Sequence, residues 1–385
     1  MLPSMSSLAS RLVAEPSVSS PDPRFDQSNR SVIDHLADYC ESLGFRVTLQ
    51  DLPGEKRNLI AVLGDGPGGL VLSGHTDTVP FDEARWESDP FTLTERDGRL
   101  YGLGSADMKG FFAAALHAAQ TFDAAQLKEP LVLIATADEE STMDGARALR
   151  EMTLPSATRA IIGEPTGLAP VRMHKGILME AVRLIGRSGH SSDPSLGVSA
   201  LNGMSEVLRT LTDARQEMRS QRNEQFAVPE PTLNLGRIEG GDSPNRICSS
   251  CYLSFDVRLL PSMDAAATRD GLHARIRAAV SELGGSESAL AVEFETLAKA
   301  VPPFETAADA STVRVLEELS GHASKAVMFC TEAPFLQELG METVVCGAGD
   351  IDVAHQPNEF VTPQGLQAAS DLYAAAIQRF CVEPE

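Results

Sequence analysis

Several imidazole and carboxylate side chains in this sequence stand at or shortly after the ends of short apolar runs. The set comprises His75, Asp77, Asp107, Asp138, Glu139, Glu140, Glu164 and His355. Imidazole and carboxylate together are ligands suited to zinc, cobalt or manganese. One catalytic ion needs about three protein ligands and a water molecule, and this set offers more. Two ions that share one bridging carboxylate fit the ligand count better than a single ion.

Neighbouring members of this set suggest different roles. A histidine that binds a metal usually donates its second ring N–H to a carboxylate. We therefore predict that His75 is a ligand and that Asp77, two residues on, orients it. Adjacent residues of an extended segment point in opposite directions, so Glu140 can bind metal while Glu139 takes a proton from water as a general base.

Each of these residues also has an ordinary explanation. A histidine near a glycine is commonly a polar loop residue, adjacent glutamates are commonly solvated, and the GEP segment around Glu164 could simply begin a turn. Residue types and spacing alone leave two interpretations open, a two-metal site and an incidental acidic cleft. We assign no function to His117 or to the C-x-x-C pair of Cys248 and Cys251.

The apolar runs predict the elements that position these side chains. Five runs are typical of buried strands: FRVTL, NLIAVLG, GLVLSGH, LVLIATA and RAIIGEP. Apolar residues at three- and four-residue spacing predict helices over 4–14 and 27–43, and an Ala/Phe-rich helix covers 108–122. Strands interleaved with helices indicate an α/β sheet covered on both faces. Ligands of such sheets bind beyond the carboxyl ends of the strands, which is where the candidate residues fall.

A different pattern occupies the middle of the chain. Strands are predicted at 177–187 and in TLNLGRI, ICSSCYLSFDVRLL and ALAVEFETL, with helices at 198–219 and 264–283. This β-α-β-β-α-β order is the split-βαβ layout of a small α+β domain. The first pattern resumes near Phe304. We therefore predict a discontinuous catalytic domain, residues 1–174 and 300–385, interrupted by an inserted domain, residues 175–299.

Composition limits the classes of function. Aspartate and glutamate number 54 against 32 lysines and arginines, a formal net charge of −22. This excess argues against unaided binding to nucleic acid or an anionic membrane. The N-terminal residues lack an apolar core of signal-peptide length, and the six cysteines are scattered, which favours reduced thiols. We expect a cytoplasmic protein that acts on a small molecule.

The segments that carry the candidate residues resemble a known family. GHTDTVP, GLGSADMKG, ATADEES, IIGEPT and AHQPNEF are similar, in this order, to motifs of the M20 family of zinc-dependent aminoacylases and peptidases. The similarity covers nearly the whole chain. It implies a mixed-sheet zinc-hydrolase domain with an inserted dimerisation domain, a homodimer, and metal-dependent hydrolysis of an N-acyl amino acid.

The resemblance also implies metal-binding roles. Asp107 would bridge two divalent ions, which we expect to be zinc, with cobalt or manganese as alternatives. His75 and Glu164 would complete one metal site, and Glu140 and His355 the other.

The remaining roles follow from the same resemblance. Glu139 would be the general base and Asp77 would support His75. His190, in the GHSS segment, would reach the active site of the partner subunit and stabilise the oxyanion. Asn245 and Arg258 would bind the α-carboxylate of the substrate.

Two alternatives remain open. One is another reaction of the same family, such as deacetylation of N-acetylcitrulline, desuccinylation or dipeptide cleavage. The other is a metal-dependent binding protein without catalytic activity, which would need ligands but no base such as Glu139 beside the water.

Overall fold

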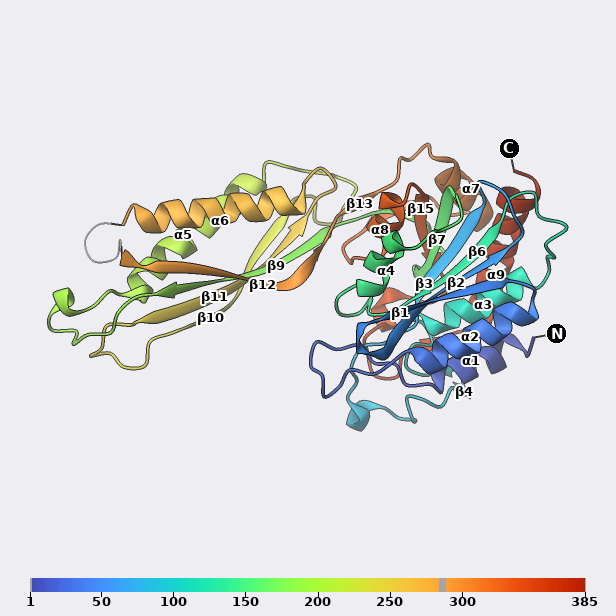
Figure 1. Ribbon diagram of the computed structural model, residues 1–385, viewed down its shortest axis with the longest axis horizontal. Coiled ribbons are helices and arrows are strands. Elements are labelled where there is room, and N and C mark those ends of the chain that lie inside the picture. The colour runs from blue at the N-terminus through green and yellow to red at the C-terminus, as the bar shows by residue number, and fades with distance from the viewer. Residues whose placement is uncertain (1, 284–288, 385) are drawn as a thin grey trace. The chain divides into compact units, whose positions relative to one another are not determined.

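The computed structural model describes residues 2–283 and 289–384, which form two compact units (Figure 1). The first unit comprises Met1–Arg172, Thr306–Lys325 and Thr331–Glu385. The second comprises Met173–Glu305 and Ala326–Cys330. The chain thus passes from the first unit into the second, returns to the first, and later contributes one further short segment to the second.

A mixed sheet forms the centre of the first unit. Its strands lie in the order β1-β2-β6-β3-β7-β15. Their bounds are β1 Arg46–Leu52, β2 Lys56–Leu63, β6 Leu131–Thr136, β3 Leu70–His75, β7 Arg159–Pro165 and β15 Glu342–Gly347. The last four run parallel, whereas β1 and β2 are antiparallel to their neighbours. Beyond β15, strand β8 (Val171–His174) pairs antiparallel with it. The predicted mixed α/β sheet is confirmed.

Helices cover both faces of this sheet. Their bounds are α1 Met5–Val13, α2 Arg30–Ser42, α3 Lys109–Ala119, α4 Asp144–Ala148, α7 Ser311–Ser320, α8 Ala333–Glu338 and α9 Pro363–Ile377. Helices α1, α2, α3 and α9 lie on one side, and α4 and α8 lie on the other (Figure 1). Every residue of β3 and β6 is consequently buried, as expected for central strands covered on both faces.

The parallel strands bring their carboxyl ends to one edge of the sheet. Strand β3 lies between β6 and β7, and His75 pairs with Thr136 at the end of the ladder. A small sheet in the order β16-β5-β4 lies in the same unit, with β4 Thr94–Arg96, β5 Arg99–Tyr101 and β16 Phe360–Val361. Its pairing of Phe360 with Tyr101 joins the segment after His355 to the segment before Asp107.

The second unit is a four-stranded antiparallel sheet with two helices. The strand order is β10-β11-β9-β12. The bounds are β9 Gly176–Ile185, α5 Ala200–Met218, β10 Thr232–Gly240, β11 Ser250–Leu259, α6 Ala265–Ser281 and β12 Ala291–Val301. Two short strands, β13 Phe304–Glu305 and β14 Lys325–Val327, are not part of this sheet and pair with β8. The main elements follow the predicted β-α-β-β-α-β order.

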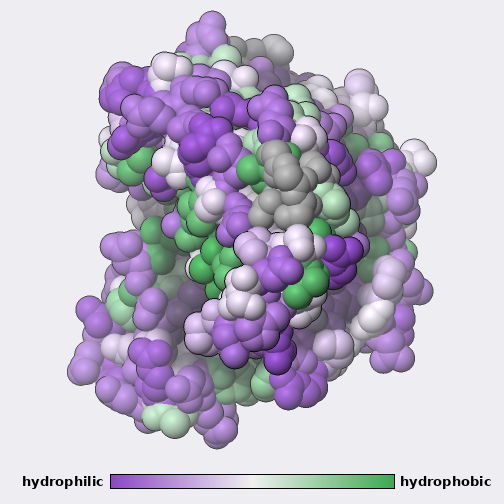
Figure 2. Space-filling view, turned by 90° about the vertical axis from the view of Figure 1, so that its left-hand side faces the viewer, coloured by the Kyte–Doolittle hydropathy of each residue, from purple (hydrophilic) through white to green (hydrophobic). Residues whose placement is uncertain are grey.

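Amphipathic patterns explain this second layout. Burial alternates along β11 with a period of two, and α5 buries residues at three- and four-residue intervals, so each element offers one apolar face. These faces form one core that includes Val182, Val207, Phe255 and Ile276. Hydrophilic residues predominate on the face seen in Figure 2, with smaller hydrophobic groups between them.

Among the residues that the structure describes, no helix combines the length and apolar character needed to span a bilayer.

Close packing of α3 on β7 gives a test of this architecture. A Cβ atom added at Gly163 would lie 1.9 Å from Cδ2 of Phe111, so Gly163→Ala should lower the free energy of unfolding by about 1–3 kcal/mol through overpacking. Calorimetry or urea unfolding would measure the change.

Gly271 is the matched control, because its Cβ would meet no atom within 4 Å. It lies inside α6, so Gly271→Ala should raise stability by about 0.5–1 kcal/mol through helix propensity. Equal effects of the two substitutions would contradict the packing argument.

Candidate metal centre

Asp107 stands between two histidines. Its Oδ1 lies 3.1 Å from Nε2 of His75, and its Oδ2 lies 3.2 Å from Nε2 of His355. Each carboxylate oxygen therefore faces a different imidazole. Asp107 and His75 are buried, whereas His355 is half-exposed. This is the arrangement that a carboxylate shared by two cations requires.

Glu164 and Glu140 each extend one side of this centre. Oε1 of Glu164 lies 3.6 Å from Nε2 of His75, and Oε2 of Glu140 lies 3.0 Å from Nε2 of His355. Ligand atoms fall within 4.8 Å of one another in the groups His75–Asp107–Glu164 and Asp107–Glu140–His355. The structure thus brings all five predicted metal ligands together.

Five separate segments supply these side chains. His75 ends β3 and Glu164 lies near the end of β7. Asp107 precedes α3, and Glu140 and His355 lie in the loops after β6 and β15. Parallel strands place the first two at the same edge of the sheet, and the loops add the others.

The electrostatics of this centre suit cations. Burial lowers the pKa of His75, but its hydrogen bond with Asp107 and the charge of Glu164 outweigh burial, so the pKa lies well above its usual value. Hydrogen bonds with Asp107 and Glu140 raise the pKa of His355 to about 10. Burial, together with the charge of Asp107, raises the pKa of Glu164 well above its usual value.

So many buried carboxylates are costly unless a positive charge accompanies them. Ligand protons are exchanged for metal when an ion binds. Two imidazoles and two glutamates around the shared Asp107 therefore fit two divalent ions.

Asp77 holds the loop that carries Glu139. Its Oδ1 accepts the backbone N–H of Glu139 at 3.2 Å, and its Oδ2 accepts that of Glu140 at 3.1 Å. His75 directs Nδ1 to the backbone oxygen of Asp77 at 3.0 Å, while the Asp77 carboxylate lies 3.7 Å away. The structure thus differs from the predicted carboxylate contact, because the main-chain oxygen of Asp77, not its carboxylate, lies at hydrogen-bond distance from His75.

The predicted general base lies in this centre. Glu139 forms a third group of possible ligand atoms with His75 and Glu140. Burial raises the pKa of Glu139 well above its usual value, and the charge of Glu140 adds to this effect. Its position beside the ligands suits proton transfer to and from a water molecule at the centre.

Glu359 is a further residue of this centre, one that the sequence motifs did not single out. Its buried carboxylate accepts the backbone N–H groups of Gly104, Ala106 and Asp107 at 3.1, 2.7 and 2.9 Å. Burial and the charge of Asp107 raise its pKa to about 8. Glu359 follows His355 by four residues, so it ties the two ligand segments together. In the sequence, Glu359 is marked only by its place in the AHQPNEF motif, which does not reveal its backbone N–H partners.

Glu332 was also missed. It is buried beside Thr136, and burial raises its pKa to about 7. Its charge contributes to the raised pKa of Glu139. Nothing in the FCTEAPF segment distinguished this residue from a surface glutamate at a helix start.

The other three predicted site residues lie in the second unit. His190 is exposed, and its Nδ1 accepts the backbone N–H of Ser192 at 3.2 Å. It forms an isolated bridge with Arg246, next to Asn245, and Ser191 N–H donates to the Asn245 carbonyl at 3.1 Å.

Arg258 lies at the other end of β11. It pairs with Ile177 and Thr232, whereas the His190–Arg246 bridge lies beyond Ser250. Eight residues of antiparallel strand separate Ser250 from Arg258, about 27 Å. The structure therefore brings His190 close to Asn245 but places Arg258 far from both.

Comparison with known proteins gives consistent relatives. The family model described as Peptidase family M20/M25/M40 matches residues 71–379 of this chain. Acetylornithine deacetylase of Pasteurella multocida (strain Pm70) is 46% identical over 383 residues, 99% of each chain. Acetylornithine deacetylase of Proteus mirabilis (strain HI4320) is 45% identical over 384 residues, 99% of this chain and 98% of the relative.

Solved structures share the fold at lower identity. Aminopeptidase PepT from Bacillus cereus ATCC 10987 has a TM-score of 0.75 at 21% identity, covering 97% of both chains. Human carnosine dipeptidase 1 has a TM-score of 0.70 at 19% identity, covering 97% of this chain and 96% of the other. The predicted resemblance is confirmed: this chain belongs to the peptidase family M20/M25/M40.

Proposed function

We propose that this protein hydrolyses N2-acetyl-L-ornithine to L-ornithine and acetate. Full-length relatives with this activity in their names, about 45% identical, support the substrate. The segments RSGHSSDPSLGV, PTLNLGRIEGGDSPNRIC and FCTEAPF also resemble such enzymes. The reaction would supply ornithine for arginine biosynthesis.

One observation carries the chemistry of this proposal. Glu139 lies beside the five proposed metal ligands, and the two ions do not need it as a further ligand. A site that only binds a ligand has no use for an additional carboxylate of this kind. Family membership and this base favour a hydrolase of amide bonds over a binding protein without activity.

The residues of this chain divide the steps between them. His75, Asp107, Glu164, Glu140 and His355 would hold two divalent ions, zinc with cobalt or manganese as alternatives. Such ions supply Lewis-acid activation of water and of the acyl carbonyl.

Glu139 takes the proton of the attacking water while the water oxygen adds to the acetyl carbon. The carbon–nitrogen bond then breaks, and Glu139 returns the proton to the departing amine. Asp77 keeps Glu139 in place through the two backbone N–H groups described above.

The second unit would complete the site in a homodimer. We propose that His190 stabilises the oxyanion in the partner subunit and that Asn245 and Arg258 bind the α-carboxylate of the substrate. Because about 27 Å of strand separates the two ends of β11, Asn245 and Arg258 can meet one carboxylate only if they come from different protomers. We expect this dimer to act in the cytoplasm on a small-molecule substrate.

A substrate panel with metal removal and return tests the proposal. Amine release should be fastest from N2-acetyl-L-ornithine, compared by kcat/KM with acetylcitrulline, succinyl-diaminopimelate and a dipeptide. A chelator should abolish turnover, and zinc, cobalt or manganese should restore it. A higher kcat/KM for another substrate would replace acetylornithine, and activity that survives complete metal removal would contradict the metal-dependent mechanism.

Glu139→Gln tests the general base. The substitution preserves shape but cannot accept the proton, so kcat should fall by about 10²–10⁴-fold while bound metal, measured by elemental analysis, stays unchanged. Glu41→Gln on the exposed face of α2 is the matched control and should keep full activity. Full turnover of Glu139→Gln would remove this residue from the mechanism.

His190→Ala tests action across the dimer. Loss of one oxyanion donor should lower kcat by about 10²–10³-fold. Mixing this variant with Glu139→Gln should restore activity, since a mixed dimer has one site with both groups intact if His190 acts in the partner subunit. Random mixing predicts roughly a quarter of the wild-type activity. No recovery in mixtures shown to contain mixed dimers would mean that His190 does not act in the partner's site.

A further inference from the structure

Asp138 forms the turn that positions Glu139, the proposed general base, and Glu140, a proposed metal ligand. It has a left-handed backbone, with φ of 62°. Its carbonyl accepts the N–H groups of Thr142 at 3.1 Å and Met143 at 2.6 Å. The next two residues, Glu139 and Glu140, direct their own N–H groups to Asp77. The position of both glutamate side chains therefore depends on this turn.

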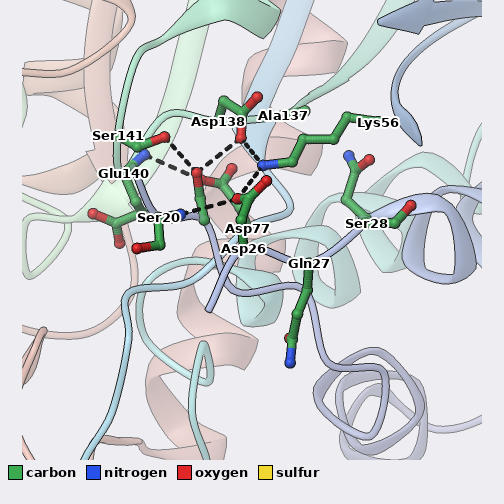
Figure 3. Close-up of polar contacts among 12 residues, drawn as sticks. Ser20, Asp26, Gln27, Ser28, Lys56, Asp77, Ala137, Asp138, Glu140 and Ser141 are labelled. Atoms are coloured by element: carbon green, nitrogen blue, oxygen red, sulfur yellow. Dashed lines mark hydrogen bonds and ion pairs between the residues drawn. The ribbon is translucent and has the colours of Figure 1, made fainter. Parts of the chain in front are cut away.

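A buried lysine holds the Asp138 side chain (Figure 3). Lys56 lies at the start of β2, and only 5% of its side chain is exposed. Its Nζ contacts Oδ1 of Asp138 and lies 2.6 Å from Oδ1 of Asp26. One ammonium group thus pairs with two largely buried carboxylates, and Lys56 itself belongs to the sheet.

The N-terminal segment reinforces the same contact. Ser19 donates its hydroxyl to Oδ1 of Asp138 at 2.8 Å and pairs with the hydroxyl of Ser141 at 2.5 Å. Ser20 N–H donates to Oδ1 of Asp26 at 3.0 Å. Ser19 N–H donates to the carbonyl of Thr78, just after His75 and Asp77. The Asp138 turn is therefore attached to the segment that carries the first metal ligand.

We propose that Lys56 is a positioning residue for Glu139, acting through the charge of Asp138. Among the residues that the structure describes, Lys56 pairs through its ammonium group with Asp26 and Asp138 and with none of the proposed ligands, so its effect must pass through the turn. This inference rests on the proposed function for the role of Glu139. Without the ammonium group, Asp138 would be a partly buried carboxylate with a hydroxyl partner alone, and it would move toward water. A displacement of about 1 Å at a catalytic group can cost about a hundredfold in rate.

Lys56→Met tests this role, because methionine fills similar space without charge. We expect kcat to fall by roughly ten- to a hundredfold with little change in KM. Hydrogen–deuterium exchange followed by mass spectrometry should show faster exchange in residues 138–143 and unchanged exchange in the centre of the sheet. Arg57→Met is the matched control: Arg57 is the next residue of β2 and pairs with Asp34 and Asp51 instead. It should leave kcat and exchange at 138–143 unchanged.

A second variant separates the charge from general stability. In Lys56→Met/Asp138→Asn the turn no longer carries a carboxylate that has lost its lysine, whereas Asp26 loses the lysine in both variants and keeps the N–H of Ser20. Asparagine tolerates the left-handed backbone. We expect the double variant to recover at least fivefold in kcat over Lys56→Met, or to fold where the single variant does not.

Three outcomes would overturn the inference: kcat of Lys56→Met within twofold of wild type, faster exchange throughout the unit, or no recovery in the double variant. If the wild-type protein fails to hydrolyse acetylornithine, the proposed function fails instead, and exchange at 138–143 still tests whether Lys56 holds the turn.

Discussion

The concentration of buried negative charge around Asp107 is the constraint on which this structure depends. Asp107 has a histidine at each carboxylate oxygen, and Glu140 and Glu164 lie beside those histidines. Carboxylates at such distances repel one another unless cations or protons lie between them. The fold therefore has to hold these groups against their own repulsion, and it does so through backbone N–H groups of the ligand segments, which donate to Asp77 and Glu359.

The supporting contacts form a second set that differs in chemistry from the ligands. Asp77 and Glu359 both accept backbone N–H groups, so each fixes the main chain of a neighbouring ligand segment. Lys56 fixes a side chain instead. Main-chain contacts of this type fix the backbone position of a ligand residue. Its side chain then only has to span the distance from that backbone to the metal centre. This explains why residues far apart in the sequence can meet within a few ångströms.

The sequence could single out the candidate ligands because most of them stand next to a recognisable strand or helix signal. His75 and Glu164 end apolar runs, and parallel strands necessarily share an edge. The β-α-β-β-α-β order was visible because the half-buried strand β11 alternates with a period of two. Glu359 and Lys56 could not be found in this way, because their importance lies in contacts with backbone atoms or with residues 82 positions away. The main-chain contact from Asp77 to His75 was hidden for the same reason, since side-chain identity says little about carbonyl direction.

The second unit shows how strand length limits the arrangement of a site. His190 and Asn245 lie past one end of β11, and Arg258 lies near the other. A residue pair at this separation cannot close on one small molecule from the same protomer, whatever the orientation of the unit. A substrate carboxylate held by both would need two copies of the chain, each contributing the opposite end of its strand. Under that arrangement, the homodimer would be part of the substrate site rather than a means of stabilising the fold, and the two ends of β11 in one chain would serve different active sites.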